Sequence, residues 1–586
     1  MIKPVTGAPE MNSGMVHDAR CACWRRFHGL REIRAARHWV EVMPLLEWVE
    51  NQVAADGVWA MGFVTYEAAP AMDPALAVRP SGSLPLAWFG IYESAEPVAL
   101  AALAPDEIKP ALAWEPGASL PAYREAIRKI KNYIQAGETY QVNYTLRLRA
   151  GFPQRPWPFF RQMLAAQEAR YGAYIETRDW AIASASPELF FEGDGGRLVS
   201  RPMKGTRPRG LCFEDDEAQA GQLRSSAKER AENVMIVDMV RNDLGRVARP
   251  GSVRVGSLFE VERYRTLWQM TSQVECQTDH GLPEIFRALF PAASITGAPK
   301  PRTMRIISEL EMDPRGVYTG AIGFVAPGGR AQFAVAIRTL HLDKTCHRAE
   351  YGVGGGIVWD STAEAEYEEC RIKAGVLAAP VPEFRLLETM LWTPEAGFSL
   401  LDEHLIRLQK SARYFDFRFH REHIETGLRE AARPLPSRPH KFRLLVARDG
   451  TPGIEIHPVE PWAQPVRLGL ARQPVQTANV FLYHKTTHRE VYEQARRDHP
   501  EAGDVLLWNE RGEITESCLA NVLVKIGGEW FTPPLACGLL PGTFRAQLLA
   551  QGAVREKVIK TGELSHCAQI LLVNSVRGKY EAFLPR

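Results

Sequence analysis

The chain has 586 residues, with 71 Lys and Arg against 69 Asp and Glu, so its formal net charge at pH 7 is only +2. Such a balance creates no field that would favour nucleic acid or an anionic membrane surface. Hydrophobic residues make up 45% of the sequence and charged residues 24%, which is typical of globular proteins with large cores and excludes a disordered chain.

Neither a membrane helix nor a signal peptide is predicted. The apolar stretch 98–104 is far shorter than the ~18 residues that a membrane helix needs, and residues 1–15 contain no apolar core of a signal peptide. The nine cysteines are unevenly spread and do not form a disulfide framework. We therefore expect a soluble, cytoplasmic protein that binds neither nucleic acid nor membrane.

Helical and strand-like patterns follow one another without strict alternation. Apolar alternation predicts strands at 58–66 and 83–92, and helical spacing predicts a helix at 121–137. This order indicates an α+β fold rather than a doubly wound parallel sheet. Later in the chain, helices are predicted at 225–244, 281–290, 300–310 and 363–376, and strand-like segments at 316–325 and 332–342.

One proline-rich break divides the chain. Residues 377–382, Leu-Ala-Ala-Pro-Val-Pro, follow a predicted helix and contain two prolines that cannot continue it. We expect a first domain at 1–376, a linker at 377–384 and a second domain at 385–586.

Two predicted helices each carry a Glu-x-x-Glu pair. Glu229 and Glu232 lie one turn apart in the first helix, and Glu366 and Glu369 repeat the spacing in the second. Two such pairs facing each other would form an all-oxygen site for a hard cation such as Mg²⁺. The alternative is two solvated acidic faces, but the apolar run 234–240 indicates that the first helix is largely buried.

A glycine-rich segment, 351–360, lies between these helices. It is not a dinucleotide-binding fingerprint, because Ile357 takes the place of the third glycine and no helix follows directly. It can either present consecutive backbone N–H groups to an anion or form a tight turn between strands. Arg338, on a predicted strand, adds a donor for a carboxylate and needs a partner among its apolar neighbours.

Lys204 lies in a basic segment together with Arg201, Arg207 and Arg209. Neighbouring cations disfavour protonation of an ammonium group, so Lys204 is a candidate nucleophile or base. The alternative is a solvated basic loop.

Several blocks of the first domain carry a family resemblance. The blocks are Gln141–Thr145, Ser186–Phe190, Pro202–Thr206, the helix at 230–246, Ser294–Lys300, Arg338–Thr339 and 352–373, in that order. They resemble the chorismate-utilising enzymes, and most closely the component I group of aminodeoxychorismate synthases, over about residues 60–375. The resemblance implies a large chorismate-binding α/β sandwich.

The resemblance also implies a role for each candidate residue. Glu188 would be the general acid and base that assists loss of the C4 hydroxyl of chorismate. Lys204 would attack C2 to form a covalent adduct, which ammonia then displaces at C4. Mg²⁺ would hold the ring carboxylate of the substrate. Glu232 and Glu369 would bind Mg²⁺ directly with Glu229 and Glu366 beside them, and Thr296, Gly297, Tyr318, Arg338, Gly354 and Gly355 would contact the substrate.

Two positions discriminate among the chorismate-utilising enzymes. Anthranilate synthases are expected to carry Ala where this chain has Lys204, so Lys204 favours amination at C4. Isochorismate and salicylate synthases are expected to carry a water-activating Lys where this chain has Gln141, so water should not be the nucleophile. Since no cysteine lies on the glycine-rich turn of a glutamine amidotransferase, we expect ammonia to come from a separate amidotransferase subunit or from solution.

The second domain contains one helix and three motifs that belong together. The predicted helix 400–412 with Arg407 is, taken alone, typical of a surface helix. Segments 484–489, 509–521 and 538–545 follow it. Together they resemble the fold-type IV pyridoxal phosphate enzymes, which include branched-chain aminotransferases and aminodeoxychorismate lyase. The resemblance implies a two-lobed domain that binds pyridoxal 5′-phosphate, and it is compatible with a homodimer formed through this domain.

In such a domain Lys485 would form the Schiff base and Glu516 would pair with the pyridine nitrogen. A lyase would use Lys485 to remove the C4 proton, so that enolpyruvate leaves as the ring becomes aromatic. Arg577 is a candidate contact for a substrate carboxylate. The phosphate would be held by Arg407, Gly542 and Thr543.

We therefore expect a bifunctional enzyme of folate precursor synthesis, which converts chorismate and ammonia to 4-amino-4-deoxychorismate and then to 4-aminobenzoate and pyruvate. One alternative is an anthranilate synthase component fused to an aminotransferase. Another is a synthase with a non-catalytic C-terminal scaffold, but the joint presence of Lys485, Glu516 and Arg407 counts against it. The fusion favours the lyase, because the first domain would make its substrate.

Overall fold

The structure, a computed structural model, describes residues 3–100, 112–153, 155–167, 169–377, 383–460 and 464–585. The chain divides into two units. The first contains residues 1–209 and 219–381, and the second contains residues 210–218 and 382–586. The expected linker, 377–384, lies largely outside the described residues, whereas the assignment of 210–218 to the second unit has no counterpart in the sequence pattern.

Within the described residues, the strands of the first unit join into one mainly antiparallel sheet system of 19 strands. Its longest pairing joins β3 to β5, and a second joins β7 to β19 over ten consecutive residue pairs. The strands are β1 (Lys3–Val5), β2 (Ser13–Asp18), β3 (Cys23–Ala36), β4 (Trp59–Val64), β5 (Ala87–Leu100), β6 (Glu115–Pro116), β7 (Gln141–Gly151), β8 (Ala173–Glu176), β9 (Trp180–Ser184), β10 (Leu189–Asp194), β11 (Arg197–Arg201), β12 (Met203–Pro208), β13 (Arg254–Arg263), β14 (Leu267–Gln277), β15 (Gly297–Ala298), β16 (Ala321–Val325), β17 (Ala331–Val335), β18 (Thr339–Asp343) and β19 (Arg348–Ile357).

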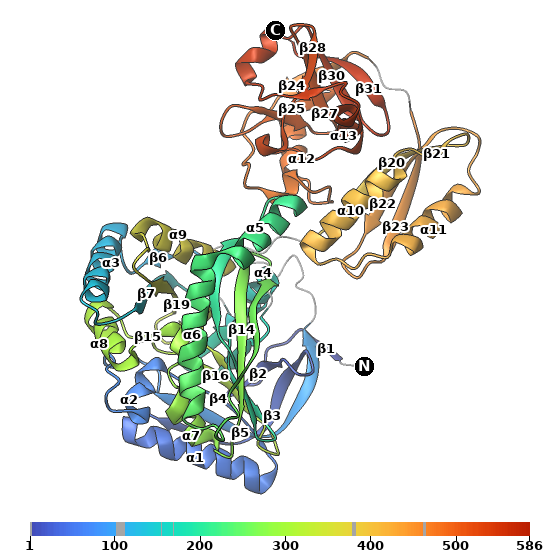
Figure 1. The fold of residues 1–586 in the computed structure, drawn as a ribbon. Helices are drawn as coiled ribbons and strands as arrows, with labels where there is room; N and C mark the ends of the chain where they lie inside the picture. The colour runs from blue at the N-terminus through green and yellow to red at the C-terminus, as the bar shows by residue number, and fades with distance from the viewer. Residues whose placement is uncertain are drawn as a thin grey trace. The chain divides into compact units, whose positions relative to one another are not determined.

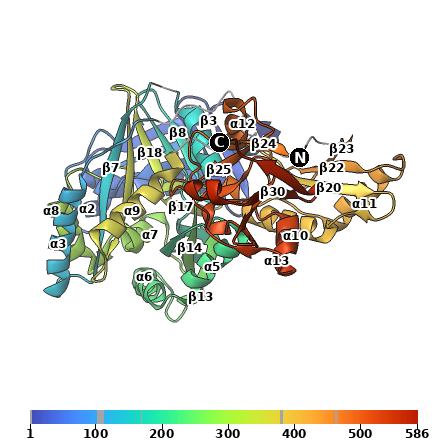
Figure 2. The ribbon, with the colours of Figure 1, turned by 90° about the horizontal axis from the view of Figure 1, so that it is seen from above.

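Helices cover the strands with their apolar faces. Figure 1 shows α6 running along β14, and Figure 2 shows α9 beside α3. The described helices are α1 (Trp39–Asp56), α2 (Ala69–Met72), α3 (Leu120–Gln135), α4 (Pro156–Ala166), α5 (Phe213–Ser225), α6 (Ala227–Gly245), α7 (Leu282–Leu289), α8 (Lys300–Leu310) and α9 (Ala363–Lys373). Of these, α3, α6, α7, α8 and α9 agree with the predicted helices to within a few residues at each end, whereas α1, α2, α4 and α5 were not predicted.

Two caps set where the glutamate-bearing helices begin. The Ser226 hydroxyl accepts a hydrogen bond from the backbone N–H of Glu229 at the start of α6, at 3.3 Å. The Thr362 hydroxyl does the same for Ala365 at the start of α9, at 3.4 Å. Because each cap fixes the first turn, the Glu-x-x-Glu pairs lie near the N-terminal ends of their helices. The buried face of α6, which contains Ile236, Val237, Val240 and Leu244, holds the helix against the core.

Arg338 is not on a strand, contrary to the sequence-based prediction. The predicted strand 332–342 is two strands, β17 and β18, and Arg338 lies between them with φ +51°. The break is needed because the two halves pair with different neighbours: β17 with β10 and β16, and β18 with β9 and β19.

The glycine-rich segment is neither a loop nor a turn. Gly352 to Gly356 lie inside β19 and pair in register with Arg147 to Asn143 of β7. The absence of side chains lets other groups approach this strand closely, which is the property that the site uses.

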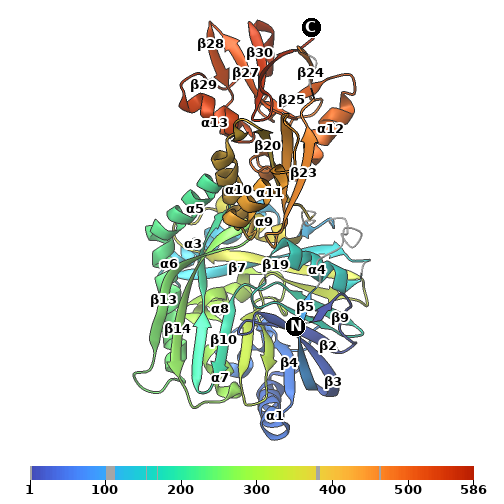
Figure 3. The same ribbon diagram turned by 90° about the vertical axis from the view of Figure 1, so that its right-hand side faces the viewer.

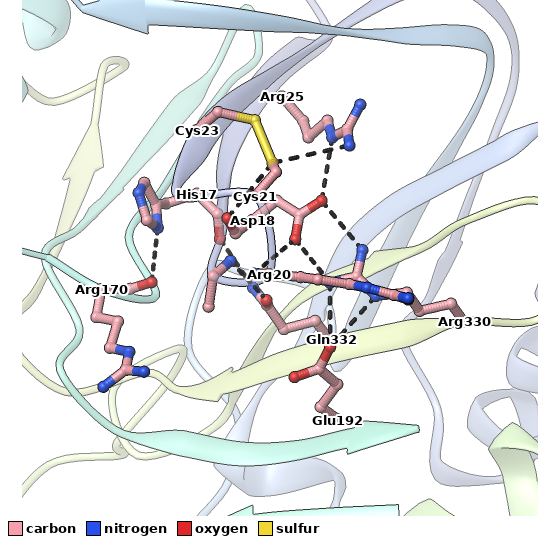
Figure 4. Close-up of a disulfide and its surroundings, with 11 residues drawn as sticks. His17, Asp18, Arg20, Cys21, Cys23, Arg25, Arg170, Glu192, Arg330 and Gln332 are labelled. Atoms are coloured by element: carbon pink, nitrogen blue, oxygen red, sulfur yellow. Dashed lines mark hydrogen bonds and ion pairs between the residues drawn. A yellow bond between two sulfur atoms is a disulfide. The ribbon is translucent and has the colours of Figure 1, made fainter. Parts of the chain in front are cut away.

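The turn between β2 and β3 contains a disulfide that the sequence did not predict. Cys21 and Cys23 are bonded, so the bridge closes a loop of sequence separation two rather than building a framework. Figure 4 shows it beside Asp18, a buried carboxylate that accepts hydrogen bonds from Arg25 at 3.1 Å and from Arg330 at 2.6 and 3.0 Å. These two arginines outweigh the effect of burial and hold the pKa of Asp18 below its usual value.

The second unit contains two sheets. Figure 3 shows α10 (Leu401–Phe415) and α11 (Arg421–Ala432) packed on the smaller sheet, whose strand order is β21-β20-β22-β23. The larger sheet has the order β26-β25-β24-β31-β30-β27-β28-β29, with α12 (Glu490–Asp498) and α13 (Thr543–Ala550) beside it. The strands are β20 (Leu386–Thr393), β21 (Gly397–Phe398), β22 (His440–Val446), β23 (Pro452–Pro458), β24 (Val466–Leu470), β25 (Asp504–Trp508), β26 (Ile514–Ser517), β27 (Asn521–Ile526), β28 (Glu529–Thr532), β29 (Arg555–Glu556), β30 (Gln569–Asn574) and β31 (Gly578–Phe583).

Residues 210–218 pack entirely as part of the second unit. The hydroxyl of Tyr414 on α10 donates a hydrogen bond to the Gly210 carbonyl at 2.7 Å. Leu211 and Cys212 pack against a core cluster of this unit that includes Tyr483. In the part of the chain that the structure describes, no helix is both long and apolar enough to cross a membrane.

Candidate active sites

A cavity in the first unit brings together residues from segments that are far apart in the sequence. Its walls come from β12, α6, β19 and α9, and from the segments around 188, 294, 318 and 338. It contains all four paired glutamates and the candidate nucleophile. The predicted site residues that line it are Glu188, Lys204, Glu229, Glu232, Tyr318, Arg338, Gly354, Gly355, Glu366 and Glu369.

The four glutamates face this cavity from two helices. Burial raises the pKa values of Glu229, Glu232 and Glu366, and neighbouring carboxylates raise them further. Glu369 differs: burial raises its pKa, but Lys373 at 2.6 Å outweighs burial, so the pKa lies below its usual value. Crowded carboxylates of this kind are stabilised by a cation.

The donor set fits a hard cation, but the ligands do not yet converge. Among the described residues, no three acidic, histidine or cysteine side chains are grouped closely enough to hold a metal ion. Two of the four glutamates have lysine partners instead: Lys373 pairs with Glu369, and Lys228 lies 3.9 Å from Glu232. Mg²⁺ would therefore have to replace ammonium groups at two of its ligands.

Lys204 is surrounded by carboxylates rather than by arginines. Its ammonium group acts electrostatically on Glu188, Glu232 and Glu369. Arg201 pairs with Glu262 at 2.7 Å, and Arg207 donates to Gln222 at 2.7 Å. The argument that neighbouring cations activate Lys204 is therefore wrong, because the arginine side chains have other partners.

Gly356 leaves the space that the Lys204 side chain occupies. A Cβ atom at this position would lie 2.3 Å from Lys204 Nζ and 3.0 Å from the Gln141 side chain. We expect Gly356→Ala to lower turnover of the first unit by at least tenfold, because displacement of a reacting group by ~1 Å can cost ~10²-fold. Steady-state kinetics with chorismate measure this. Gly193→Ala, where the nearest atom lies 3.8 Å away, is the matched control, and equal activity of the two variants would contradict the assignment.

Glu188 is poised to exchange a proton near neutral pH. Its carboxyl group is 3% exposed, and Oε1 accepts a hydrogen bond from the Ser294 hydroxyl at 2.6 Å. Burial raises its pKa to about 7, although Ser294 and Lys204 act in the opposite direction. It is therefore protonated in part at neutral pH, as a general acid must be.

The far wall of the cavity holds a buried arginine and a tyrosine. Arg338 donates a hydrogen bond to Oε1 of Gln167. The Tyr318 ring lies flat against the backbone of Gly352, where a Cβ would come within 2.2 Å of the ring. Thr296 and Gly297 do not line the cavity; their neighbours Ser294 and Ile295 do.

A second constellation lies in the second unit, around Lys485. Burial, together with the nearby Arg489 and Arg407, lowers the pKa of Lys485 to about 7. Burial raises the pKa of Glu516 to about 7. The Glu516 carboxylate accepts hydrogen bonds from Tyr492 at 2.8 Å and from Asn521 at 3.1 Å. The structure thus places an amine that is neutral in part at pH 7 and a fixed carboxyl group in one buried region.

Arg407 is held in place by Glu388 on the neighbouring strand β20. Its guanidinium group donates to Glu388 at 2.9 and 2.6 Å and to the Pro541 carbonyl at 3.1 Å, just before α13. Gly542 caps α13 and Thr543 begins it. A helix N-terminus next to an arginine is a site for an anion such as phosphate.

Arg577 does not join this group in the structure. It lies on the exposed turn between β30 and β31, where its guanidinium group donates to the Glu460 carbonyl at 3.0 Å.

Sequence reasoning missed several residues of both sites. Lys373 could have been found, because it follows Glu369 at the i,i+4 spacing of a helical ion pair. Ser294, Glu388 and Tyr492 carry no such local signal, because each meets its partner through long-range folding.

Two families of known proteins match successive parts of the chain. Residues 95–379 match the family of chorismate binding enzymes, and residues 385–581 match the class IV aminotransferases. The two matches follow one another along the sequence, the first over about half of the chain and the second over about a third.

Named relatives match the first of these parts. The aminodeoxychorismate synthase component 1 of Bacillus subtilis (strain 168) is 42% identical over 254 residues, which are 43% of this chain and 54% of that protein. The anthranilate synthase component 1 3 of Haloarcula marismortui is also 42% identical, over 45% of this chain and 52% of that protein. The chain thus spans about half the length of these relatives.

A solved structure shares the fold of the first unit. Anthranilate synthase component I from Streptococcus pneumoniae TIGR4 has a TM-score of 0.51 and 25% sequence identity, over 64% of this chain and 93% of that chain.

Proposed function

We propose that the first unit converts chorismate and ammonia to 4-amino-4-deoxychorismate, and that the second unit converts this product to 4-aminobenzoate and pyruvate. The observation that carries the proposal is the presence of Lys204 in the cavity that also contains Glu188 and four glutamates. An amine at this place can bond to the ring of a carboxylate substrate while an acid assists the leaving group.

In the first step, the Lys204 nitrogen bonds to C2 of the ring as the C4 hydroxyl departs as water with a proton from Glu188. Ammonia then bonds to C4, and the bond between C2 and Lys204 breaks. Mg²⁺, held by Glu232 and Glu369 with Glu229 and Glu366 beside them, would screen the charge of the ring carboxylate. Arg338 and the backbone of Gly354 and Gly355 would hold the second carboxylate.

In the second unit, pyridoxal 5′-phosphate would supply an electron sink for the carbon that loses a proton. Lys485 would hold it covalently, Glu516 would face its ring nitrogen, and Arg407 with the start of α13 would hold its phosphate. The residues fit this group, because Lys485 has a pKa of about 7 and can be a neutral amine at neutral pH. Lys485 then accepts the C4 proton of the amino-diene as enolpyruvate leaves.

We also infer the surroundings of the reaction from the relatives, which include component 1 proteins. A separate glutamine amidotransferase subunit would supply ammonia to the first unit. We further propose that the protein forms a homodimer through the second unit and is located in the cytoplasm.

The test is the identity of the aromatic product. Purified protein is incubated with chorismate, Mg²⁺, an ammonium salt and pyridoxal phosphate, and the products are separated by chromatography. 4-Aminobenzoate with an equal amount of pyruvate is expected. Anthranilate would support the alternative suggested by the anthranilate synthase relatives. Accumulation of 4-amino-4-deoxychorismate alone would support the proposed activity of the first unit and contradict that of the second.

Glu188 makes the pH dependence of the first step predictable. A general acid must be protonated, and the pKa of Glu188 is about 7, so the rate should fall as pH rises above about 7. The expected measurement is kcat/KM for chorismate at several pH values in a large excess of ammonia, so that ammonia protonation does not limit the rate. Glu188→Gln should lose activity by ~10² to 10⁴-fold. If kcat/KM of this variant still fell above pH 7 as it does in the parent, a group other than Glu188 would be responsible for the pH dependence.

A further inference from the structure

A second cavity in the first unit lies behind Tyr318 and is not part of the proposed active site. Its volume is about 130 Å³, against about 140 Å³ for the active-site cavity, so it could take a molecule of similar size. Tyr318 and Gly352 line both cavities. The ring of Tyr318 is thus the partition between them.

The sheet register explains why polar side chains gather in this cavity. Arg147 and Arg149 of β7 are two residues apart, so they project from the same face of the sheet. Arg149 is opposite Glu350 of β19, and Glu350 is opposite His341 of β18. The register therefore places two cationic groups and an imidazole over one patch of the sheet, and Arg147, Arg149, Glu350 and His341 all line the cavity. Arg149 is already paired with Asp313 at 2.8 Å and with Glu350 at 3.3 Å, so Arg147 and His341 are the groups left to meet a ligand.

Arg147 is a buried cation without an ion-pair partner. Arg147 is 3% exposed, and no carboxylate of the described residues lies within ion-pair distance of its guanidinium group. Its guanidinium group donates to Thr145, to the Leu146 carbonyl and to the Pro314 carbonyl at 3.1 to 3.3 Å. These bonds use three of its five N–H groups, and a buried charge of this kind is stabilised by an anion.

Two further observations point to a ligand. Nε2 of His341 is buried and has no hydrogen-bond partner among the described residues. Glu67, the acidic side chain electrostatically coupled to Arg147, already accepts hydrogen bonds from the backbone N–H groups of Arg315 and Gly316 at 2.6 and 2.9 Å. The cavity therefore retains donors that its own residues do not satisfy.

The walls between these donors are partly apolar. Leu84, Val317 and the Tyr318 ring line the cavity, and the Arg147 guanidinium carbon lies 4.9 Å from the centre of that ring. A compact organic anion matches such a combination better than an inorganic one, because its carbon frame contacts the apolar wall while its charge meets Arg147.

We propose that this cavity binds a small organic carboxylate of the size of a substituted benzoate, with its charged group on Arg147 and His341. The site is separate from the proposed active site, and the binding does not depend on which reaction the first unit catalyses.

Direct binding of benzoate and of 4-aminobenzoate to the full chain, measured by calorimetry, tests the proposal without any turnover. Binding should persist in saturating chorismate. Ser83→Trp, at an exposed residue that lines the cavity, and Arg147→Gln should each weaken it at least tenfold. Arg128→Gln, which removes an exposed arginine of α3, is the matched control and should bind as the parent does.

Three results would overturn the proposal. Displacement of benzoate by chorismate would place the ligand in the active-site cavity. Parent-like binding in both Ser83→Trp and Arg147→Gln would place it elsewhere. Binding of inorganic phosphate at the same site without binding of either benzoate would exclude a carboxylate ligand.

Discussion

Replacement of Lys204 by alanine is expected to abolish amination by the first unit. The side chain lies in the cavity with Glu188 and the four glutamates, and no other amine there can take its role, because Lys228 and Lys373 are paired with Glu232 and Glu369. Loss of a nucleophile typically costs ~10³-fold or more in kcat. The measurement is the rate of 4-amino-4-deoxychorismate formation with ammonium and Mg²⁺.

Two comparisons make the Lys204 result specific. Lys204→Arg keeps the positive charge but supplies a group that does not act as a nucleophile, so it should be as inactive as the alanine variant. Lys129→Ala, an exposed lysine of α3, should keep parent activity. If Lys204→Arg retained most of the activity, the side chain would act through its charge and the covalent step would be wrong. Formation of the 4-amino product by Lys204→Ala at the parent rate would remove the basis of the proposal.

Replacement of Lys485 by alanine is expected to stop the second reaction and leave the first intact. The intermediate 4-amino-4-deoxychorismate should accumulate, and formation of 4-aminobenzoate and pyruvate should fall by ~10³-fold or more, because this amine both binds the cofactor and moves the proton. A simultaneous assay of intermediate and product by chromatography separates the two steps. Independently, the variant should lose the absorption band of lysine-bound pyridoxal phosphate that the parent shows.

A nearby lysine provides the control for this experiment. Lys410 on α10 is half-buried, pairs with Glu214 and lies in the same unit, so Lys410→Ala should keep both the absorption band and the second activity. Unchanged 4-aminobenzoate formation in Lys485→Ala would show that the second unit does not act as the proposed lyase.

The sequence predicted the glutamate-bearing helices well because their information is local. The helix predicted at 300–310 is observed at Lys300–Leu310, and α6 and α9 begin directly after Ser226 and Thr362. Both caps and both Glu-x-x-Glu pairs depend on residues within one or two turns. Periodicity and caps are therefore enough to place the glutamates on helices, though not to show that the two helices face one cavity.

The errors in the sequence analysis concern long-range pairing. The segment 351–360 was expected either to present backbone N–H groups to an anion or to form a tight turn. Residues 352–356 instead pair with residues 143–147 of β7, which are distant in sequence, and so belong to a strand. Arg338 was expected on a strand, but its neighbours on either side pair with different partners. The prediction about the surroundings of Lys204 was wrong for a related reason. The sequence neighbours of Lys204 are arginines, whereas its spatial neighbours are carboxylates.

The short excursion of residues 210–218 into the second unit determines how the chain can be divided in the laboratory. The polypeptide crosses from one unit to the other at three points, after residues 209, 218 and 381. A truncation at the proline-rich break would sever only the last crossing. It would leave Leu211 and Cys212 without the core that buries them, within the stretch that joins Lys204 to Glu229. The two halves are therefore better separated by point variants than by cutting the gene.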